Sequence, residues 1–202
     1  MAKQTSLRKR MLVIVIGTSA GGLSALSTLL EALPASYPFP ILVVQHRGKE
    51  PRELLEQVLQ EKCLLWIKQA DEKEEILAPA VYIAPPDYHL LVELDGSLSL
   101  SSEKHVNYSR PSIDVLFETA AAAYGENLSG ILLTGSNADG ARGLESIRKK
   151  GGFTIAQDPK EAQYPVMPEA AIALGAAQQI WTLAEIKTYL TETLLNELHE
   201  EK

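Results

Sequence analysis

The feature of this 202-residue sequence that most limits its fold is the alternation of short apolar segments with segments of helical spacing. Residues 11–16 (MLVIVI) and 40–45 (PILVVQ) are rich in Val and Ile, as buried strands are. Between them, leucines recur at the spacing of one helix face until Pro34 ends the pattern. Since parallel strands need crossover helices, this order predicts an α/β fold with a mostly parallel, doubly wound (Rossmann-like) sheet and helices on both faces.

The rest of the chain continues this alternation. Further helices are predicted over residues 53–59, 114–124, 141–150 and 183–198, and further strands over 64–67, 130–133, 153–156 and 179–181. Residues 81–84, 90–94 and 97–100 instead predict a small antiparallel insertion, with Asp95 and Gly96 at its tight turn. We expect a single domain over residues 11–198, preceded by a flexible basic tail over residues 1–10.

Composition excludes several classes of function. The net charge of −7 disfavours nucleic acid as a partner, because phosphate-binding surfaces need clustered Lys and Arg. No apolar run approaches the roughly 18 residues that a membrane-spanning helix requires, so insertion into a membrane is not expected. The only cysteine, Cys63, excludes an internal disulfide and suits the cytoplasm. No Cys/His spacing matches a metal site, and we expect neither metal nor cofactor.

The first chemically informative segment is residues 17–21 (GTSAG), which matches the G-x-S-x-G pattern between a strand and a helix. In that pattern the small residues allow a sharp turn that presents a serine hydroxyl above the sheet. The segment also resembles a phosphate-binding loop with a replaced middle glycine, although no acidic residue ends the second strand. It could equally be a plain glycine-rich turn. This segment alone leaves the three interpretations open.

His46 and Asp139 follow two other predicted strands. Catalytic groups collect at the carboxyl edge of parallel sheets, so both side chains should share one rim with Ser19. A capping role for Asn137 or Asp139 on the helix that begins near Ala141 is the alternative, and it is favoured when Asp139 is considered alone. Taken together, a hydroxyl, an imidazole and a carboxylate on one rim predict nucleophilic acyl chemistry.

These residues have distinct expected roles. Ser19 attacks an acyl carbon, His46 accepts and returns its proton, and Asp139 orients His46. The backbone N–H of Ala20 is a candidate oxyanion donor, and the loop around Ser136 a candidate source of a second.

With these residues in view, the sequence resembles the catalytic domain of the bacterial chemotaxis protein-glutamate methylesterases. The resemblance rests on ordered blocks: IGTSAGG (16–22), VVQH (43–46), YIAPPDYHLLV (82–92), RPSIDVLF (110–117), LLTGSNADGARG (132–143) and QDPKEAQYPVMPEAA (157–171). The serine, histidine and aspartate of that family fall on Ser19, His46 and Asp139.

The resemblance implies hydrolysis of glutamate γ-methyl esters on the cytoplasmic helices of methylated chemoreceptors, and also glutamine deamidation. It implies substrate contacts for Arg110, Tyr164 and Met167, although Arg110 is at least as well explained by pairing with a nearby carboxylate. His89 is expected to be structural. Members of this family usually carry an N-terminal receiver domain, which we do not expect in this chain. Three explanations stay open: a separate receiver or regulatory protein as a further partner, an unrestrained enzyme, or a role in a signalling pathway other than chemotaxis. Two alternatives remain: a serine esterase acting on another ester, and an inactive receptor-binding module.

Overall fold

The structure is a computed structural model that describes residues 12–47 and 55–200. Its main sheet has seven strands in the order β3-β4-β2-β1-β7-β8-β9, and every pairing within it is parallel. In chain order these strands are β1 (Val13–Thr18), β2 (Ile41–Gln45), β3 (Trp66–Gln69), β4 (Ala80–Ile83), β7 (Leu128–Leu132), β8 (Phe153–Gln157) and β9 (Gln179–Trp181). The predicted fold class is therefore confirmed.

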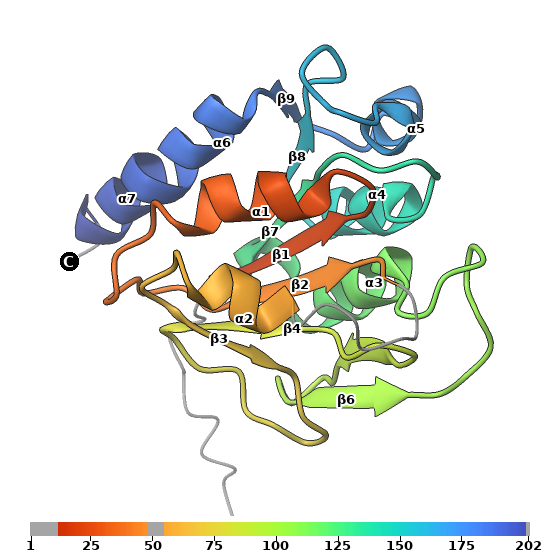
Figure 1. Ribbon diagram of the computed structural model, residues 1–202, viewed down its shortest axis with the longest axis horizontal. Helices are drawn as coiled ribbons and strands as arrows, with labels where there is room; N and C mark the ends of the chain where they lie inside the picture. The colour runs from red at the N-terminus through yellow and green to blue at the C-terminus, as the bar shows by residue number, and fades with distance from the viewer. Residues whose placement is uncertain (1–11, 48–54, 201–202) are drawn as a thin grey trace, which may run out of the picture.

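The central strands are buried on both faces because helices cover both sides of the sheet. The helices are α1 (Gly22–Leu30), α2 (Leu55–Gln60), α3 (Ile113–Tyr124), α4 (Ala141–Lys149), α5 (Val166–Ala173), α6 (Leu183–Thr188) and α7 (Leu194–Glu200). Figure 1 shows α1 and α2 in front of the sheet and α3 behind it. Alternate residues of β1 accordingly enter two separate cores: Val13 and Val15 pack with the α3 side, and Ile14 and Ile16 with the α1 side.

The order of the strands sets the position of the functional rim. β1 pairs with β2 on one side and with β7 on the other. The chain runs outward from β1 through β2, then returns to the opposite side of β1 at β7. Parallel sheets bind ligands in the crevice where the strand order reverses in this way, outside the carboxyl ends of the strands. The loops that follow β1 and β7 meet at that point.

A two-stranded antiparallel sheet stands apart from the main one. It pairs β5 (His89–Val92) with β6 (Leu98–Ser101), and Gly96 lies in its turn with a φ of 86°. This confirms the predicted hairpin, but the assignment of residues 81–84 to the same insertion was wrong. These residues largely form β4, which is fully buried and lies parallel between β3 and β2 in the main sheet. An apolar run that is buried on both faces is typical of such an interior strand.

Three further differences concern element boundaries and missed elements. β1 extends to Thr18, two residues beyond its predicted end at Ile16. Gly17 pairs with both β2 and β7, and Thr18 pairs with β2, so the turn begins at Ser19. Helix α5 was not predicted, although Pro168 is tolerated in its first turn, where the backbone N–H lacks a helical partner. The closing helix of residues 183–198 is present as α6 and α7, joined by a π-helical turn (Tyr189–Thr193). The predicted tail over residues 1–10 lies outside the described residues.

Candidate active site

Three neighbouring strand ends bring the predicted triad together. Ser19 follows β1 and His46 follows β2, and the last pair in the register of these two strands is Thr18 with Gln45. The His46 N–H continues this ladder by donating to the Thr18 carbonyl at 3.0 Å. Asp139 lies in the loop between β7 and α4, on the other side of β1. The prediction that these residues share one rim of the sheet agrees with this placement.

The backbone around Ser19 is held by hydrogen bonds from both sides. Its N–H donates to the Thr134 carbonyl at 3.0 Å, which ties the turn after β1 to the loop after β7. On the other side, Gln45 Nε2 donates to the carbonyls of Ser19 and His46, both at 2.9 Å. One side-chain amide therefore fixes the main chain of the serine relative to that of the histidine.

His46 and Asp139 form the most direct polar contact of the site. His46 Nε2 lies 2.8 Å from Asp139 Oδ2, and the histidine is partly exposed whereas Asp139 is fully buried. Because Nε2 is engaged with the carboxylate, Nδ1 is the ring nitrogen that remains for a proton transfer. A buried carboxylate that binds one nitrogen of a partly exposed imidazole is the arrangement that fixes a tautomer in serine hydrolases.

Asp139 is surrounded by hydrogen-bond donors. Besides the histidine, four groups donate to its oxygens: the side chains of Asn107 (2.8 Å) and Ser112 (2.8 Å) and the N–H groups of Ile113 (2.7 Å) and Asp114 (3.3 Å). The two N–H groups belong to the first turn of α3, where the helix dipole favours negative charge. Burial raises the pKa of Asp139, but hydrogen bonds from His46, Asn107 and Ile113 outweigh it and lower the pKa below its usual value. The carboxylate is thus held ionised.

The capping alternative for Asp139 is resolved by these contacts. Helix α4 begins after Gly140, and its first turn is capped by neither Asn137 nor Asp139 but by the side chain of Asp114, which accepts the Gly143 N–H. Asn137 Oδ1 instead accepts the N–H of Asp139 at 3.1 Å. Asp139 does act on a helix N-terminus, but on that of α3, which is remote in sequence and faces it across the rim.

The hydroxyl of Ser19 has no hydrogen-bond partner in the described part of the chain. The predicted line from hydroxyl to imidazole would require a rearrangement of Ser19 or His46, and catalytic hydrogen bonds are often long in enzymes without bound substrate. The N–H of Ser19 is used by Thr134, which leaves those of Ala20 and Ser136 as the candidate oxyanion donors. Neither of these two N–H groups bonds to another described residue.

Arg110 is fully engaged in the structure. Its guanidinium donates from Nε and Nη2 to Asp87 Oδ1 at 3.0 and 2.7 Å, and from Nη1 to the carbonyls of Ser102 and Glu103. These contacts fasten the loop before α3 to the segment after β4, through Asp87, and to the segment after β6. They favour the carboxylate-pairing interpretation of Arg110 over a direct substrate contact. His89 is buried, and its Nδ1 accepts the Ser112 N–H at 3.1 Å, as expected for a structural histidine.

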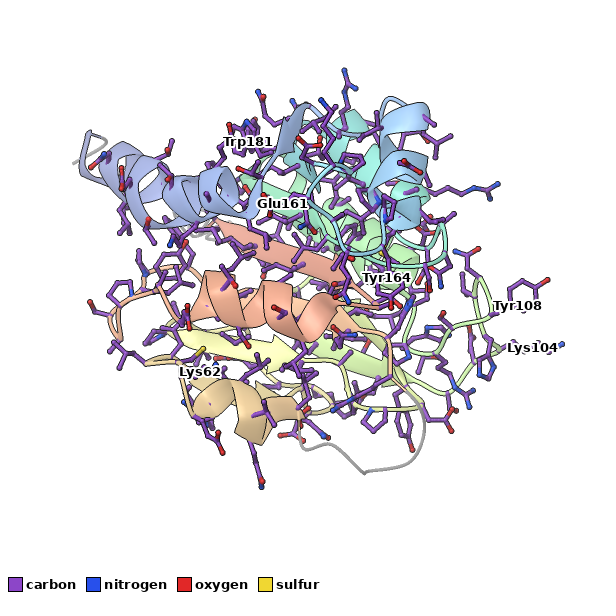
Figure 2. The ribbon with its side chains drawn as sticks, turned by 45° about the horizontal axis from the view of Figure 1, so that its top comes forward. Lys62, Lys104, Tyr108, Glu161, Tyr164 and Trp181 are labelled. Carbon is purple, nitrogen blue, oxygen red and sulfur yellow. The ribbon has the colours of Figure 1, made fainter. Side chains whose placement is uncertain are left out.

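Tyr164 and Met167 lie beside the loop after β7 and differ in exposure. The carbonyl of Tyr164 accepts the Gly135 N–H at 2.9 Å, and its side chain is 42% exposed at the rim (Figure 2). Met167 is fully buried, and its N–H donates to the Gly135 carbonyl at 3.0 Å. Tyr164 is thus accessible to a substrate, whereas Met167 packs beneath Gly135.

Gly135 supplies a direct test of this packing. A β-carbon at this position would lie 2.4 Å from Met167 Cε and 3.0 Å from Ser19 Cβ. We expect Gly135→Ala to displace the serine and to slow its labelling by a fluorophosphonate probe about 10- to 100-fold, because misplacement by about 1 Å can cost that much. Adding Met167→Ala should restore part of the rate. A Gly135→Ala variant labelled at the wild-type rate would contradict the packing described here.

Several residues that shape the site were not predicted. Gln45 was noted only as the end of a strand, although a glutamine after an apolar run is an unusual residue to bury. Asn107 and Ser112 carry no local signal, since their contacts with Asp139 span 32 and 27 residues of sequence. Only the fold brings them to the carboxylate.

A surface groove of about 600 Å³ includes Ser19 in its lining and extends over α1 toward α2. Its other walls include Ser24, Ser27 and Glu31 from the α1 side and Val58 from α2. Among the residues that the structure describes, no group of three or more His, Cys, Asp or Glu side chains could hold a metal ion. Within the same residues, no helix is both long enough and apolar enough to span a bilayer.

The sequence is similar to proteins that are named methylesterases. Residues 14–190 match the family model described as CheB methylesterase. The chain is 47% identical over 173 residues to a putative protein-glutamate methylesterase/protein-glutamine glutaminase of Leptospira interrogans, covering 86% of this chain and 90% of that protein. It is 42% identical to protein-glutamate methylesterase/protein-glutamine glutaminase 2 of Rhodospirillum rubrum, covering 85% of this chain and 48% of that protein. It thus spans nearly all of the first relative and about half of the second.

The fold is also similar to that of a solved methylesterase domain. The crystal structure of the Thermotoga maritima CheB methylesterase catalytic domain superposes with a TM-score of 0.85 at 32% identity, covering 89% of this chain and 97% of that one. The region matched by the family model, residues 14–190, includes Ser19, His46 and Asp139. Sequence and fold agree, and the chain belongs to the CheB methylesterase family.

Proposed function

We propose that this protein hydrolyses glutamate γ-methyl esters on chemoreceptors through an acyl-enzyme on Ser19. The observation that carries this proposal is the 2.8 Å contact between His46 Nε2 and the buried Asp139, placed one strand from Ser19, in a chain of the CheB methylesterase family. The names of its relatives add glutamine deamidation, which uses the same acyl-enzyme with ammonia as the leaving group.

The proposed mechanism assigns a proton path to the described groups. Ser19 Oγ attacks the γ-carbonyl carbon while His46 Nδ1 accepts the hydroxyl proton, and Asp139 stabilises the resulting imidazolium. The N–H groups of Ala20 and Ser136 receive the oxyanion. Collapse of the tetrahedral intermediate breaks the bond to the methoxy group, and His46 returns its proton to release methanol. Water then attacks the acyl-enzyme with His46 as the base, which frees the glutamate carboxylate and restores Ser19.

The shape of the site suits a substrate presented on a protein surface. The groove whose lining includes Ser19, but neither His46 nor Asp139, runs away from the proposed triad over the exterior of α1, where Ser24 and Glu31 are exposed. A glutamyl side chain on a receptor helix can approach such a groove without entering the interior. We propose the cytoplasmic helices of methylated chemoreceptors as the partner and the cytoplasm as the location. We further propose residues 11–198 as the catalytic unit, with a separate receiver or regulatory protein as an additional partner.

Methanol release from a methylated receptor tests this function. We expect the purified protein to release methanol from receptor that carries γ-methyl esters and none from unmethylated receptor. Hydrolysis of a small aryl ester without methanol release from the receptor would instead support an esterase for another substrate. Receptor binding without hydrolysis of either ester would support an inactive binding module.

A further inference from the structure

A tight turn carries a side-chain amide onto the buried end of the triad. Val106 and Ser109 exchange two backbone hydrogen bonds, of 3.1 and 2.9 Å, around Asn107 and Tyr108. The φ angles of Asn107 and Tyr108 are 50° and 63°, so both central residues are left-handed, as in a type I′ turn. Asparagine is well suited to this conformation. The turn therefore fixes the backbone from which the Asn107 amide projects.

The Asn107 amide lies between two buried carboxylates. Its Nδ2 donates to Asp139 Oδ1 at 2.8 Å and to Asp114 Oδ2 at 2.7 Å. Asp139 is fully buried and Asp114 is 4% exposed. Two negative charges this close in a weakly screened environment repel each other, and a donor shared between them offsets that repulsion.

Asp114, the second carboxylate that Asn107 contacts, is itself held in place by a hydrogen bond. Asp114 Oδ1 accepts the N–H of Gly143 in α4 at 2.7 Å, so Asp114 cannot follow a movement of Asp139 without losing that bond. Burial raises the pKa of Asp114; the hydrogen bonds from Gly143 and Asn107 oppose this rise, and the neighbouring Asp139 adds to it. Asn107 thus joins the triad carboxylate to a fixed point between α3 and α4.

We propose that Asn107 is a positioning residue of the esterase, which holds the Asp139 carboxylate toward His46 by bridging it to Asp114. This inference rests on the proposed function, because it assigns Asn107 a part in activating Ser19. Asn107 acts through Asp139 and does not touch the reacting atoms. Its loss should therefore lower the turnover of the enzyme and leave substrate binding largely unchanged.

The neighbouring residue provides a matched control. Tyr108 shares the left-handed turn with Asn107, and its side chain is fully exposed and points away from the body of the protein (Figure 2). Glycine adopts this conformation readily, so Asn107→Gly and Tyr108→Gly both preserve the turn. Only the first removes the bridging amide. Asn107→Asp keeps the size of the side chain and the turn but places a third carboxylate beside Asp114 and Asp139.

The rate of Ser19 labelling by a fluorophosphonate probe, and kcat and KM for methanol release, test the proposal at neutral pH. We expect Asn107→Gly to lower the labelling rate and kcat about 10- to 100-fold, the effect of one hydrogen bond to a charged group, with KM nearly unchanged. The labelling rate and kcat of Asn107→Asp should be lower still, and those of Tyr108→Gly should equal the wild-type values. Circular dichroism should show all three variants folded.

Any of four results would overturn this role. An Asn107→Gly variant within about threefold of the wild type would mean that the amide is dispensable. Equal losses in Asn107→Gly and Tyr108→Gly would assign the effect to the turn, as would an Asn107→Asp variant of wild-type activity. A wild-type protein that neither reacts with the probe nor releases methanol would contradict the proposed function itself, and the role of Asn107 with it.

Discussion

Replacing Ser19 by alanine is expected to lower the rate of ester hydrolysis by about 10⁶-fold, as in other enzymes with this triad, and to abolish labelling by a fluorophosphonate probe. The reason is chemical: without Oγ no acyl-enzyme can form, and only the oxyanion donors and substrate binding remain. The fold should be unaffected, because the backbone bonds to Thr134 and Gln45 do not involve the hydroxyl.

The matched control for this experiment is Ser36→Ala. Ser36 is an exposed serine in the segment that leads into β2, so it lies at the opposite end of the sheet from the site. This variant should be labelled at the wild-type rate. Labelling that persists in Ser19→Ala would show that another residue is the nucleophile, and mass spectrometry of the labelled peptide would identify it.

Replacing Asp139 by asparagine is expected to lower kcat about 10⁴-fold while the protein remains folded. The structure explains how. All five groups that contact the carboxylate can donate hydrogen bonds, so the NH₂ of an asparagine must face a donor in either orientation. If the NH₂ takes the position of Oδ2, it faces His46 Nε2 and the Ile113 N–H. Of these two groups only His46 can accept a hydrogen bond, at Nε2. Its proton then lies on Nδ1, and the imidazole can no longer accept the proton of Ser19.

The control for Asp139→Asn is Asp95→Asn. Asp95 is an exposed carboxylate in the β5–β6 turn. The next residue, Gly96, lies near Tyr124 at the C-terminal end of α3, whereas Asp139 contacts the N-terminal end of that helix. The control should retain full activity in methanol release. A loss of only a few-fold in Asp139→Asn would reassign Asp139 to a structural role at the α3 N-terminus. In that case the unfolding temperature should fall substantially while kcat stays nearly unchanged.

The sequence predicted the sheet well where strands are buried on both faces. β1 and β2 carry runs of Val, Ile and Leu without polar alternation, and β7 ends in Ile131 and Leu132, which is typical of interior parallel strands. The same reasoning misassigned β4, because its four apolar residues follow a crossover without a helix and precede a real antiparallel hairpin. Composition cannot distinguish an interior parallel strand from a short hairpin strand when the connection is irregular.

The environment of the triad was beyond prediction for a different reason. Asn107, Ser112 and the first turn of α3 reach Asp139 across 25 to 32 residues, and no periodicity records such contacts. The segment after β6 shows no apolar pattern, and its turn depends on two left-handed residues, one of which is a tyrosine.

The sequence by itself determined the alternating elements, because buried strands and helices have different apolar periods. It thereby determined the rim on which a serine, a histidine and an aspartate follow three strands. Only the tertiary structure decided that Asp139 faces the N-terminus of α3 rather than capping α4. Likewise it decided that Arg110 is committed to Asp87, and that Asn107 bridges two carboxylates. Such hydrogen bonds depend on the distance and direction between atoms far apart in the chain, which packing alone fixes.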